Sequence, residues 1–244
     1  MSSSLYQSHF KSGKKVLALL IDPEKQDPSD LSKTIRAAEE ARVDIILVGG
    51  SLTSSPIDDT LQVISKSSHI PVVLFPGNLL QISKHADGIL LLSLISGRNP
   101  EYLIGNHVMA SGFLKKSRLE IIPTGYILVG QNNHTSVAYM SNTIPIPAGK
   151  TDIILATALA GEQLGLKLIY LEAGSGASEM VQPETIKNLK QELSIPLWVG
   201  GGIKTADNIR QLYAAGADGV VVGNAVEENH RLLKTFSAVR NEFN

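Results

Sequence analysis

Short apolar runs alternate with longer amphipathic segments along the whole chain. The runs are rich in Val, Ile and Leu, and the segments between them place apolar residues three or four positions apart. Such runs are typical of buried strands, and such spacings are typical of the helices that cover them. The pattern predicts eight strands, each followed by a helix. The predicted strands cover residues 15–22, 43–51, 70–77, 86–97, 119–130, 166–176, 195–203 and 217–225.

The repeated strand–helix units indicate an α/β fold. The strands are apolar on both faces, as expected for a parallel sheet that helices cover. Eight such units within 244 residues indicate a single (β/α)8 TIM barrel, a fold that takes about 250 residues. An open doubly wound sheet is the alternative, because it needs no pairing between the first and last strands. No linker interrupts the pattern, so we expect one domain over residues 1–244.

Local sequence features predict where several helices begin and end. Ser29 or Asp30 is the expected N-cap of the first helix, and Gly165 is expected just beyond the helix that starts at Thr151, because these residue types are favoured there. Residues 131–150 form a polar segment that is long for a loop. Loops of this length are usually functional or mobile, and the sequence does not decide between the two.

Composition excludes several classes of protein and of site. The chain has 22 Lys and Arg against 23 Asp and Glu, a net charge of −1, whereas nucleic-acid-binding proteins usually carry a basic excess. Cysteine is absent, which excludes disulfides, thiolate metal sites and a cysteine nucleophile. No apolar run reaches the roughly 18 residues that a membrane helix needs, and the first residues lack an apolar signal region. We therefore expect a cytoplasmic protein that does not bind nucleic acid.

Glycine-rich segments follow the last three predicted strands. They are residues 174–176 after strand six, 200–202 after strand seven, and 223–224 after strand eight. In a TIM barrel these positions lie at the face that carries the active site. Glycine allows positive φ and close approach, so backbone N–H groups there can converge on a phosphate. The alternative is that these glycines only form tight turns. Lys25 and Lys204 lie in loops from which they could reach a bound phosphate.

Polar side chains end three of the predicted strands. Asp22 and Ser51 end the first two strands, and their oxygens suit Mg²⁺ if a substrate brings further oxygen ligands. Asp22 could instead be a general base or a helix N-cap. Glu172, near the end of strand six, could be a general base or a structural partner of a Lys or Arg. Tyr170 shares its face by period-two alternation, and could donate a hydrogen bond or fill the barrel.

Other chemistries find little support in the sequence. No lysine lies within a predicted strand end, which disfavours a Schiff-base aldolase. Asp58 and Asp59 fall on the polar face of a predicted helix, where we expect them to be solvated. No histidines are paired at a metal-ligand spacing, so we expect all six at the surface: His9, His69, His85, His107, His134 and His230.

Five segments together carry a resemblance that spans nearly the whole chain. They are LLIDPEK (19–25), VGGS (48–51), YLEAGSG (170–176), VGGGI (199–203) and VVGNA (221–225). The chain resembles the geranylgeranylglyceryl phosphate synthase family, in the branch with the AGSG loop. The resemblance implies a (β/α)8 barrel and a Mg²⁺-dependent prenyltransferase. Such an enzyme forms an ether between the 3-hydroxyl of sn-glycerol 1-phosphate and a polyprenyl diphosphate, with geranylgeranyl as the expected group, and releases diphosphate.

The resemblance also implies roles for particular residues. Asp22 and Ser51 match the Mg²⁺ positions, and Glu172 matches the residue that accepts the glycerol hydroxyl proton. A second branch carries a lysine at the position of Leu20, so that contact is absent here. The implied binding residues for glycerol phosphate are Tyr170, Leu171, Glu172, Ala173, Gly174, Ser175, Gly176, Gly201, Gly202, Gly223 and Asn224.

The prenyl chain needs an apolar groove, and the resemblance implies further partners. Apolar residues near strands three to five are the candidates for the groove: Phe75, Leu91, Leu92, Ile95 and Tyr126. A homo-oligomer, either a dimer or a hexamer, and a transient contact with a membrane surface are also implied.

Two other functions stay open at this point. One is a different phosphate-binding barrel enzyme, a phosphosugar isomerase or lyase, which would need neither Mg²⁺ nor a prenyl groove. The other is a barrel that binds a phosphorylated metabolite without catalysis. Dependence on Mg²⁺ would exclude the first, and loss of function on replacing Asp22 and Glu172 would exclude the second.

Overall fold

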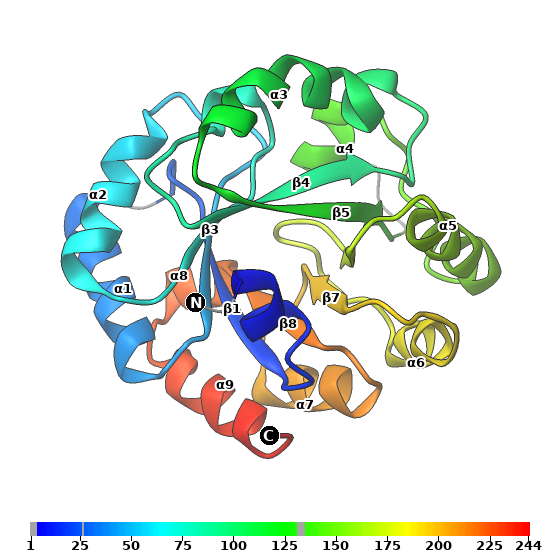
Figure 1. Ribbon diagram of the computed structural model, residues 1–244. Helices are drawn as coiled ribbons and strands as arrows, with labels where there is room; N and C mark the ends of the chain where they lie inside the picture. The colour runs from blue at the N-terminus through cyan, green and yellow to red at the C-terminus, as the bar shows by residue number, and fades with distance from the viewer. Residues whose placement is uncertain (1–3, 26, 131–134) are drawn as a thin grey trace.

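Eight parallel strands form a closed barrel with helices on its outside (Figure 1). The computed structural model describes residues 4–25, 27–130 and 135–244. Each strand pairs in parallel with the next along the chain, and β8 pairs with β1 to close the barrel. The predicted TIM barrel is therefore confirmed, and the open doubly wound sheet is wrong.

The strands are shorter than the predicted ones but lie within them. They are β1 Val16–Ile21, β2 Ile45–Val48, β3 Val72–Leu74, β4 Gly88–Leu94, β5 Glu120–Leu128, β6 Leu168–Glu172, β7 Leu197–Gly200 and β8 Gly219–Val222. The α-helices are α1 Pro28–Glu40, α2 Ile57–Ser67, α3 Asn106–Lys116, α4 Ser136–Ser141, α5 Thr151–Gln163, α6 Pro183–Glu192, α7 Ala206–Ala214, α8 Asn224–Glu228 and α9 Leu232–Asn241. Three short helical turns complete the described elements: η1 Tyr6–Phe10, η2 Leu79–Gln81 and η3 Glu101–Gly105.

The first helix begins earlier than its sequence predicts. Asp27 is the N-cap of α1, because its carboxylate accepts hydrogen bonds from the N–H groups of Ser29 and Asp30, at 2.8 and 3.0 Å. The predicted N-cap at Ser29 or Asp30 is therefore wrong. Pro28 occupies the first helical position, where its missing N–H costs nothing. Asp22 does not cap this helix, since its carboxylate instead accepts a hydrogen bond of 3.1 Å from the N–H of Glu24.

The long polar segment after β5 has structure of its own. It contains the short helix α4, and Ile146 forms an isolated parallel bridge with Val129. Residues 131–134 of this segment, with His134, lie outside the described residues. Gly165 follows α5 with a φ of 87°, as predicted for the residue beyond a helix end.

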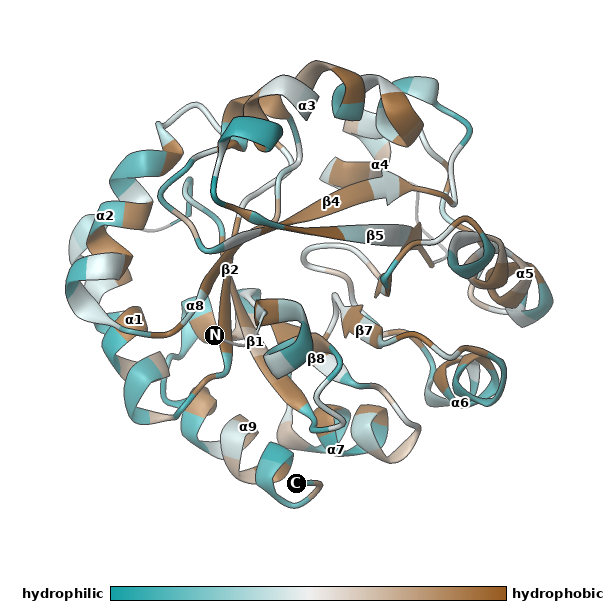
Figure 2. Cartoon of the chain, in the orientation of Figure 1, coloured by the Kyte–Doolittle hydropathy of each residue, from teal (hydrophilic) through white to brown (hydrophobic). Residues whose placement is uncertain are grey.

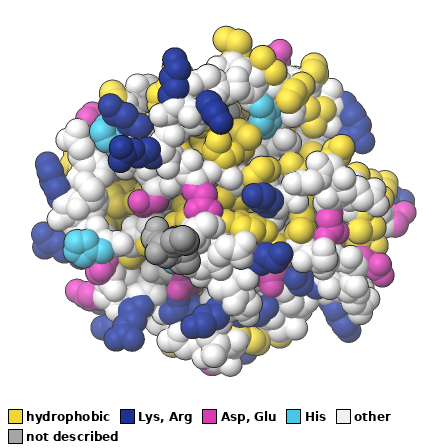
Figure 3. All heavy atoms as spheres, viewed as in Figure 1, with side chains coloured by type: hydrophobic (Ala, Val, Ile, Leu, Met, Phe, Trp, Pro, Cys, Tyr) yellow, Lys and Arg dark blue, Asp and Glu magenta, His cyan; other side chains and the backbone are white. Residues whose placement is uncertain are grey.

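Apolar side chains fill two layers, one between strands and helices and one inside the barrel. The strands are accordingly brown in the hydropathy view (Figure 2). On the face seen in Figure 3, basic and acidic side chains are interspersed rather than gathered by sign. No helix within the described residues is long and apolar enough to cross a membrane.

The η1 turn closes the amino-terminal end of the barrel. Phe10 stacks on Trp198, with ring centroids 4.4 Å apart and planes 8° from parallel. Gly219 on β8 leaves the room for the indole, because a Cβ at Gly219 would collide with it. The Glu120 carboxylate holds η1 in place by accepting hydrogen bonds from the N–H groups of Leu5 and Tyr6.

Phe10→Ala should destabilise the protein by about 3–5 kcal/mol, because it empties a buried aromatic site that the surroundings cannot refill. Equilibrium unfolding in urea would measure the loss. Phe113→Ala on α3 is the matched control, since this ring is 47% exposed, and should change the free energy of unfolding by about 0.5 kcal/mol or less. A similar small change for Phe10→Ala would contradict the role of η1 as a plug.

Candidate active site

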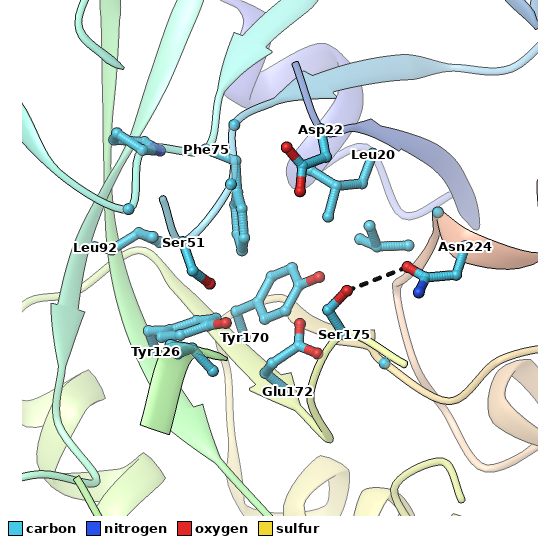
Figure 4. A pocket seen from close by; sticks show the side chains of 18 of the residues that line it. Leu20, Asp22, Ser51, Phe75, Leu92, Tyr126, Tyr170, Glu172, Ser175 and Asn224 are labelled. Carbon is cyan, nitrogen blue, oxygen red and sulfur yellow. Dashed lines mark hydrogen bonds between the residues drawn. The ribbon is translucent and has the colours of Figure 1, made fainter. Parts of the chain in front are cut away.

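A cavity of about 570 Å³ opens at the carboxyl ends of the strands. It brings together most of the residues that the sequence singled out (Figure 4). Those that line it are Asp22, Ser51, Tyr170, Glu172, Ser175, Gly176, Gly201, Gly202, Gly223 and Asn224. Leu171, Ala173 and Gly174 do not line it. Alternation along β6 turns Leu171 toward the layer between strands and helices, and Ala173 packs against the same layer.

Glu172 is the last residue of β6 and is only 6% exposed. Its Oε1 accepts a hydrogen bond of 2.7 Å from the N–H of Gly174. Burial raises the pKa of Glu172 to about 7, although the hydrogen bond from the Gly174 N–H and the nearby Tyr170 hydroxyl oppose the rise. No described Lys or Arg forms an ion pair with it, so a purely structural ion pair does not explain this carboxylate. A carboxylate with a pKa near neutrality is suited to accept a proton.

Tyr170 lies on the same face of β6 as Glu172, as the alternation predicts. Its ring packs against those of Phe75 and Tyr126, with centroids 5.1 and 5.5 Å away. Its hydroxyl is buried beside the Glu172 carboxylate (Figure 4). Burial raises the pKa of Tyr170 well above its usual range, so the hydroxyl stays protonated and can donate. Gly200 makes room, because a Cβ there would collide with this hydroxyl.

The loops after β6 and β7 need glycine for their conformation. Gly174, Gly176, Gly201 and Gly202 have φ values of 108°, 74°, 83° and 69°, which side chains rarely adopt. A Cβ at Gly201 would also lie 2.5 Å from Glu172 Oε1. Gly223 differs, because its φ is −139° and its ψ is −89°, so it does not adopt the positive φ of the other four glycines.

Three residues that line the cavity after β6, β7 and β8 have backbone N–H groups that no described residue accepts from. The N–H groups of Gly176, Gly202 and Asn224 donate to no other described residue. Ser175 Oγ adds a hydroxyl, which in this structure donates to Asn224 Oδ1 at 3.2 Å (Figure 4). Converging N–H groups of this kind form a cradle for an anion, and we call these four residues the phosphate cradle.

Lys25 reaches this cradle from the loop after β1. Its Nζ donates to Ser175 Oγ and to Asn224 Oδ1, both at 3.2 Å. It also lies 3.5 Å from the carboxylate of Glu227 on α8. Burial raises the pKa of Glu227, and the Lys25 ammonium opposes that rise. The sequence placed Lys25 within reach of a phosphate but pointed to no role for Glu227.

Asp22 and Ser51 follow β1 and β2, which pair with each other. Gly50, in the loop after β2, lets the backbone pass the Asp22 carboxylate, since a Cβ there would lie 2.8 Å from Oδ1. No group of three or more His, Asp or Glu that could hold a metal occurs within the described ranges. One carboxylate and one hydroxyl fit a hard cation that takes its other ligands from water and phosphate oxygens.

An apolar arm extends the cavity toward α3. Four of the five predicted groove residues line it: Phe75, Leu91, Leu92 and Tyr126. Ile95 does not, because its side chain lies against Gly125 and Gly161 near α5.

The prediction that all six histidines lie at the surface is wrong for His107. This residue is half-buried in the apolar arm, with Nε2 3.3 Å from Ser93 Oγ. Its Nδ1 is buried with no hydrogen-bond partner in the described part of the chain. Burial lowers the pKa of His107, so the ring is neutral near pH 7. A lone histidine in an amphipathic helix has no sequence feature that would have predicted this position.

Known proteins resemble this chain over most of its length. The PcrB family model matches residues 11–240. A geranylgeranylglyceryl phosphate synthase from Spirosoma linguale is 47% identical over 96% of this chain and 94% of its own. One from Pyrococcus abyssi is 41% identical over 89% and 86%.

A solved structure is also similar over most of the chain. It is (S)-3-O-geranylgeranylglyceryl phosphate synthase from Thermoplasma acidophilum in complex with sn-glycerol-1-phosphate. The two chains are 33% identical and superpose with a TM-score of 0.90 over 95% of each. The family match covers more than half of the chain, and the relatives match over most of their own length. The chain therefore belongs to the PcrB family.

Proposed function

We propose that this protein is a prenyltransferase that joins the 3-hydroxyl of sn-glycerol 1-phosphate to a geranylgeranyl group. The relatives from Spirosoma linguale and Pyrococcus abyssi carry the name of this synthase, and the Thermoplasma acidophilum structure holds sn-glycerol-1-phosphate. The observation that carries the proposal is Glu172, a buried carboxylate with a pKa of about 7. It lies between a phosphate cradle and an apolar arm in one cavity.

The geometry suggests how the reaction proceeds. The phosphate cradle binds the phosphate of the glycerol substrate, which fixes its free hydroxyl near Glu172. Glu172 accepts the hydroxyl proton as the oxygen forms its bond to C1 of the prenyl group, and the bond from C1 to the diphosphate breaks. Tyr170 donates a hydrogen bond that orients the glycerol or the carboxylate. Holding both substrates in one cavity supplies a large part of the rate enhancement.

Asp22 and Ser51 are the residues proposed to hold Mg²⁺. Their oxygen donors suit this ion when a diphosphate supplies further oxygens. The ion would neutralise the charge that develops on the diphosphate as it leaves. Asp22 thereby acts in catalysis together with Glu172.

The apolar arm is proposed to take the prenyl chain. Exposed apolar side chains lie on the helices near this arm, including Val108 and Met109 on α3 and Tyr139 on α4. They support a homo-oligomer, a dimer or a hexamer, and a transient contact with a membrane surface for product release. As part of the same proposal, we expect the protein to act in the cytoplasm.

Incubation with radiolabelled sn-glycerol 1-phosphate, Mg²⁺ and prenyl diphosphates of increasing length tests the function. Label should pass into organic solvent, and EDTA should abolish this transfer. sn-Glycerol 3-phosphate is the control and should give far less product. The preferred diphosphate reports the length of the apolar arm. No extractable label with any chain length would contradict the proposal and favour a phosphosugar isomerase or lyase, which a rise in melting temperature with phosphosugars would then identify.

A further inference from the structure

Lys25 is a charged residue inside the cavity to which the reaction scheme gives no role. It follows β1 and spans the mouth of the barrel to the loops after β6 and β8. Its ammonium donates to Ser175 Oγ and Asn224 Oδ1 and lies 4.0 Å from Asp22 Oδ2. The ammonium therefore lies between the phosphate cradle and the proposed Mg²⁺ residues.

The residues that line the cavity carry an excess of negative charge, which a cation at this point would offset. Among the described residues that line it, carboxylates outnumber lysines by four to two: Asp22, Glu172, Glu227 and Glu228 against Lys25 and Lys204. A phosphate monoester adds up to two further negative charges, and desolvated anions need compensation. Of the two lysines, Lys25 is the one whose Nζ hydrogen-bonds to cradle side chains.

Two hydrogen-bond donors converge on one weak acceptor in the cradle. Lys25 Nζ and Ser175 Oγ both donate to Asn224 Oδ1 at 3.2 Å. An anionic phosphate oxygen at this point would accept from the same two donors more strongly, because charge-assisted hydrogen bonds are shorter and stronger than neutral ones. A substrate phosphate can therefore replace Asn224 Oδ1 as the acceptor for Lys25 and Ser175.

We propose that Lys25 binds the phosphate of sn-glycerol 1-phosphate. Before this substrate enters, the Lys25 ammonium is paired with the Glu227 carboxylate, and it gives up this ion pair when the phosphate binds. The proposal rests on the proposed function for the identity of the substrate. Lys25 is then a substrate-binding residue, and the ammonium exchanges the Glu227 carboxylate for the phosphate. Glu227 competes with the substrate for the same charge.

Substitutions at the two residues should therefore act in opposite directions. Lys25→Met should weaken the binding of sn-glycerol 1-phosphate about 10- to 100-fold, since a hydrogen bond to a charged group is lost. Lys25→Arg keeps the charge and should retain most of the affinity. Glu227→Gln removes the competitor and should tighten binding about two- to fivefold, the range for a partly exposed ion pair. Isothermal titration without diphosphate or Mg²⁺ measures these affinities directly.

The controls separate binding from folding. Lys33→Met changes an exposed lysine on α1, whose ion pair with Asp30 lies on the surface, and should bind as the unsubstituted protein does. Melting temperatures establish that each variant is folded. In steady-state assays, Lys25→Met should raise KM for sn-glycerol 1-phosphate much more than KM for the prenyl diphosphate.

Three results would overturn the proposal. One is unchanged affinity in Lys25→Met while the protein still forms the ether product, which leaves the proposed function standing. Another is equal weakening by Lys25→Met and Glu227→Gln, which would make the pair a structural tie. The third is a rise confined to KM for the diphosphate. If the protein forms no ether at all, titration of inorganic phosphate decides the same point, and equal phosphate binding with and without Lys25 would overturn it.

Discussion

Glu172→Gln should lower kcat by roughly 10²- to 10⁴-fold, the usual contribution of a general base. Glutamine keeps the size of the side chain but cannot accept the hydroxyl proton. The affinity for sn-glycerol 1-phosphate should change little, because the phosphate cradle is untouched. Steady-state kinetics with extraction of the labelled product would measure both quantities. Unchanged turnover would contradict the role of Glu172.

The pH profile provides an independent check on the same residue. Burial raises the pKa of Glu172 to about 7, and only the deprotonated form can accept a proton. The rate kcat/KM should therefore fall as the pH drops below about 7, by roughly tenfold per unit. Glu172→Gln should lose this inflection. Glu192→Gln, at the exposed end of α6, is the matched control and should keep both the rate and the profile.

Asp22→Asn should lower kcat about 10²- to 10³-fold and raise the Mg²⁺ concentration that gives half-maximal rate, because a metal ion supplies several kcal/mol of charge stabilisation. Asparagine keeps the shape beside Gly50 but removes the negative charge. Rates measured across a Mg²⁺ titration would show both effects.

A surface aspartate provides the comparison for this substitution. Asp59→Asn, on the exposed side of α2, should leave the Mg²⁺ dependence unchanged. If Asp22→Asn kept the Mg²⁺ requirement of the unsubstituted protein, the ion would have to bind elsewhere.

The order of strands and helices could be predicted because each strand–helix unit has its own local spacing of apolar residues. Strand ends were harder to place. The run 195–203 stays apolar and glycine-rich throughout, yet β7 ends at Gly200, where Gly201 and Gly202 turn the chain. Ile203 is buried as well, but in a loop, so hydropathy alone cannot distinguish it from a strand residue.

The site was predictable where strand ends carried a lone polar residue. Glu172 and Asp22 interrupt apolar runs, and a barrel brings all strand ends to one face. Glu227 gave no such indication, because it lies in a polar segment after β8. Its contact with Lys25 arises only because β8 pairs with β1 to close the barrel. Long-range closure of this kind is invisible to local patterns.

The Trp198 ring that stacks on Phe10 at the amino-terminal end of the barrel provides an intrinsic fluorescence probe of folding. Trp198 is the single tryptophan of the chain, is fully buried, and has an indole N–H without a partner among the described residues. Its fluorescence should therefore be blue-shifted in the folded protein and move to the red on unfolding. Because the ring does not line the cavity, its emission should stay constant when substrate binds. One emission spectrum can thus follow folding, undisturbed by the ligand in the sample, in every variant named above except Phe10→Ala, which removes the ring stacked on Trp198.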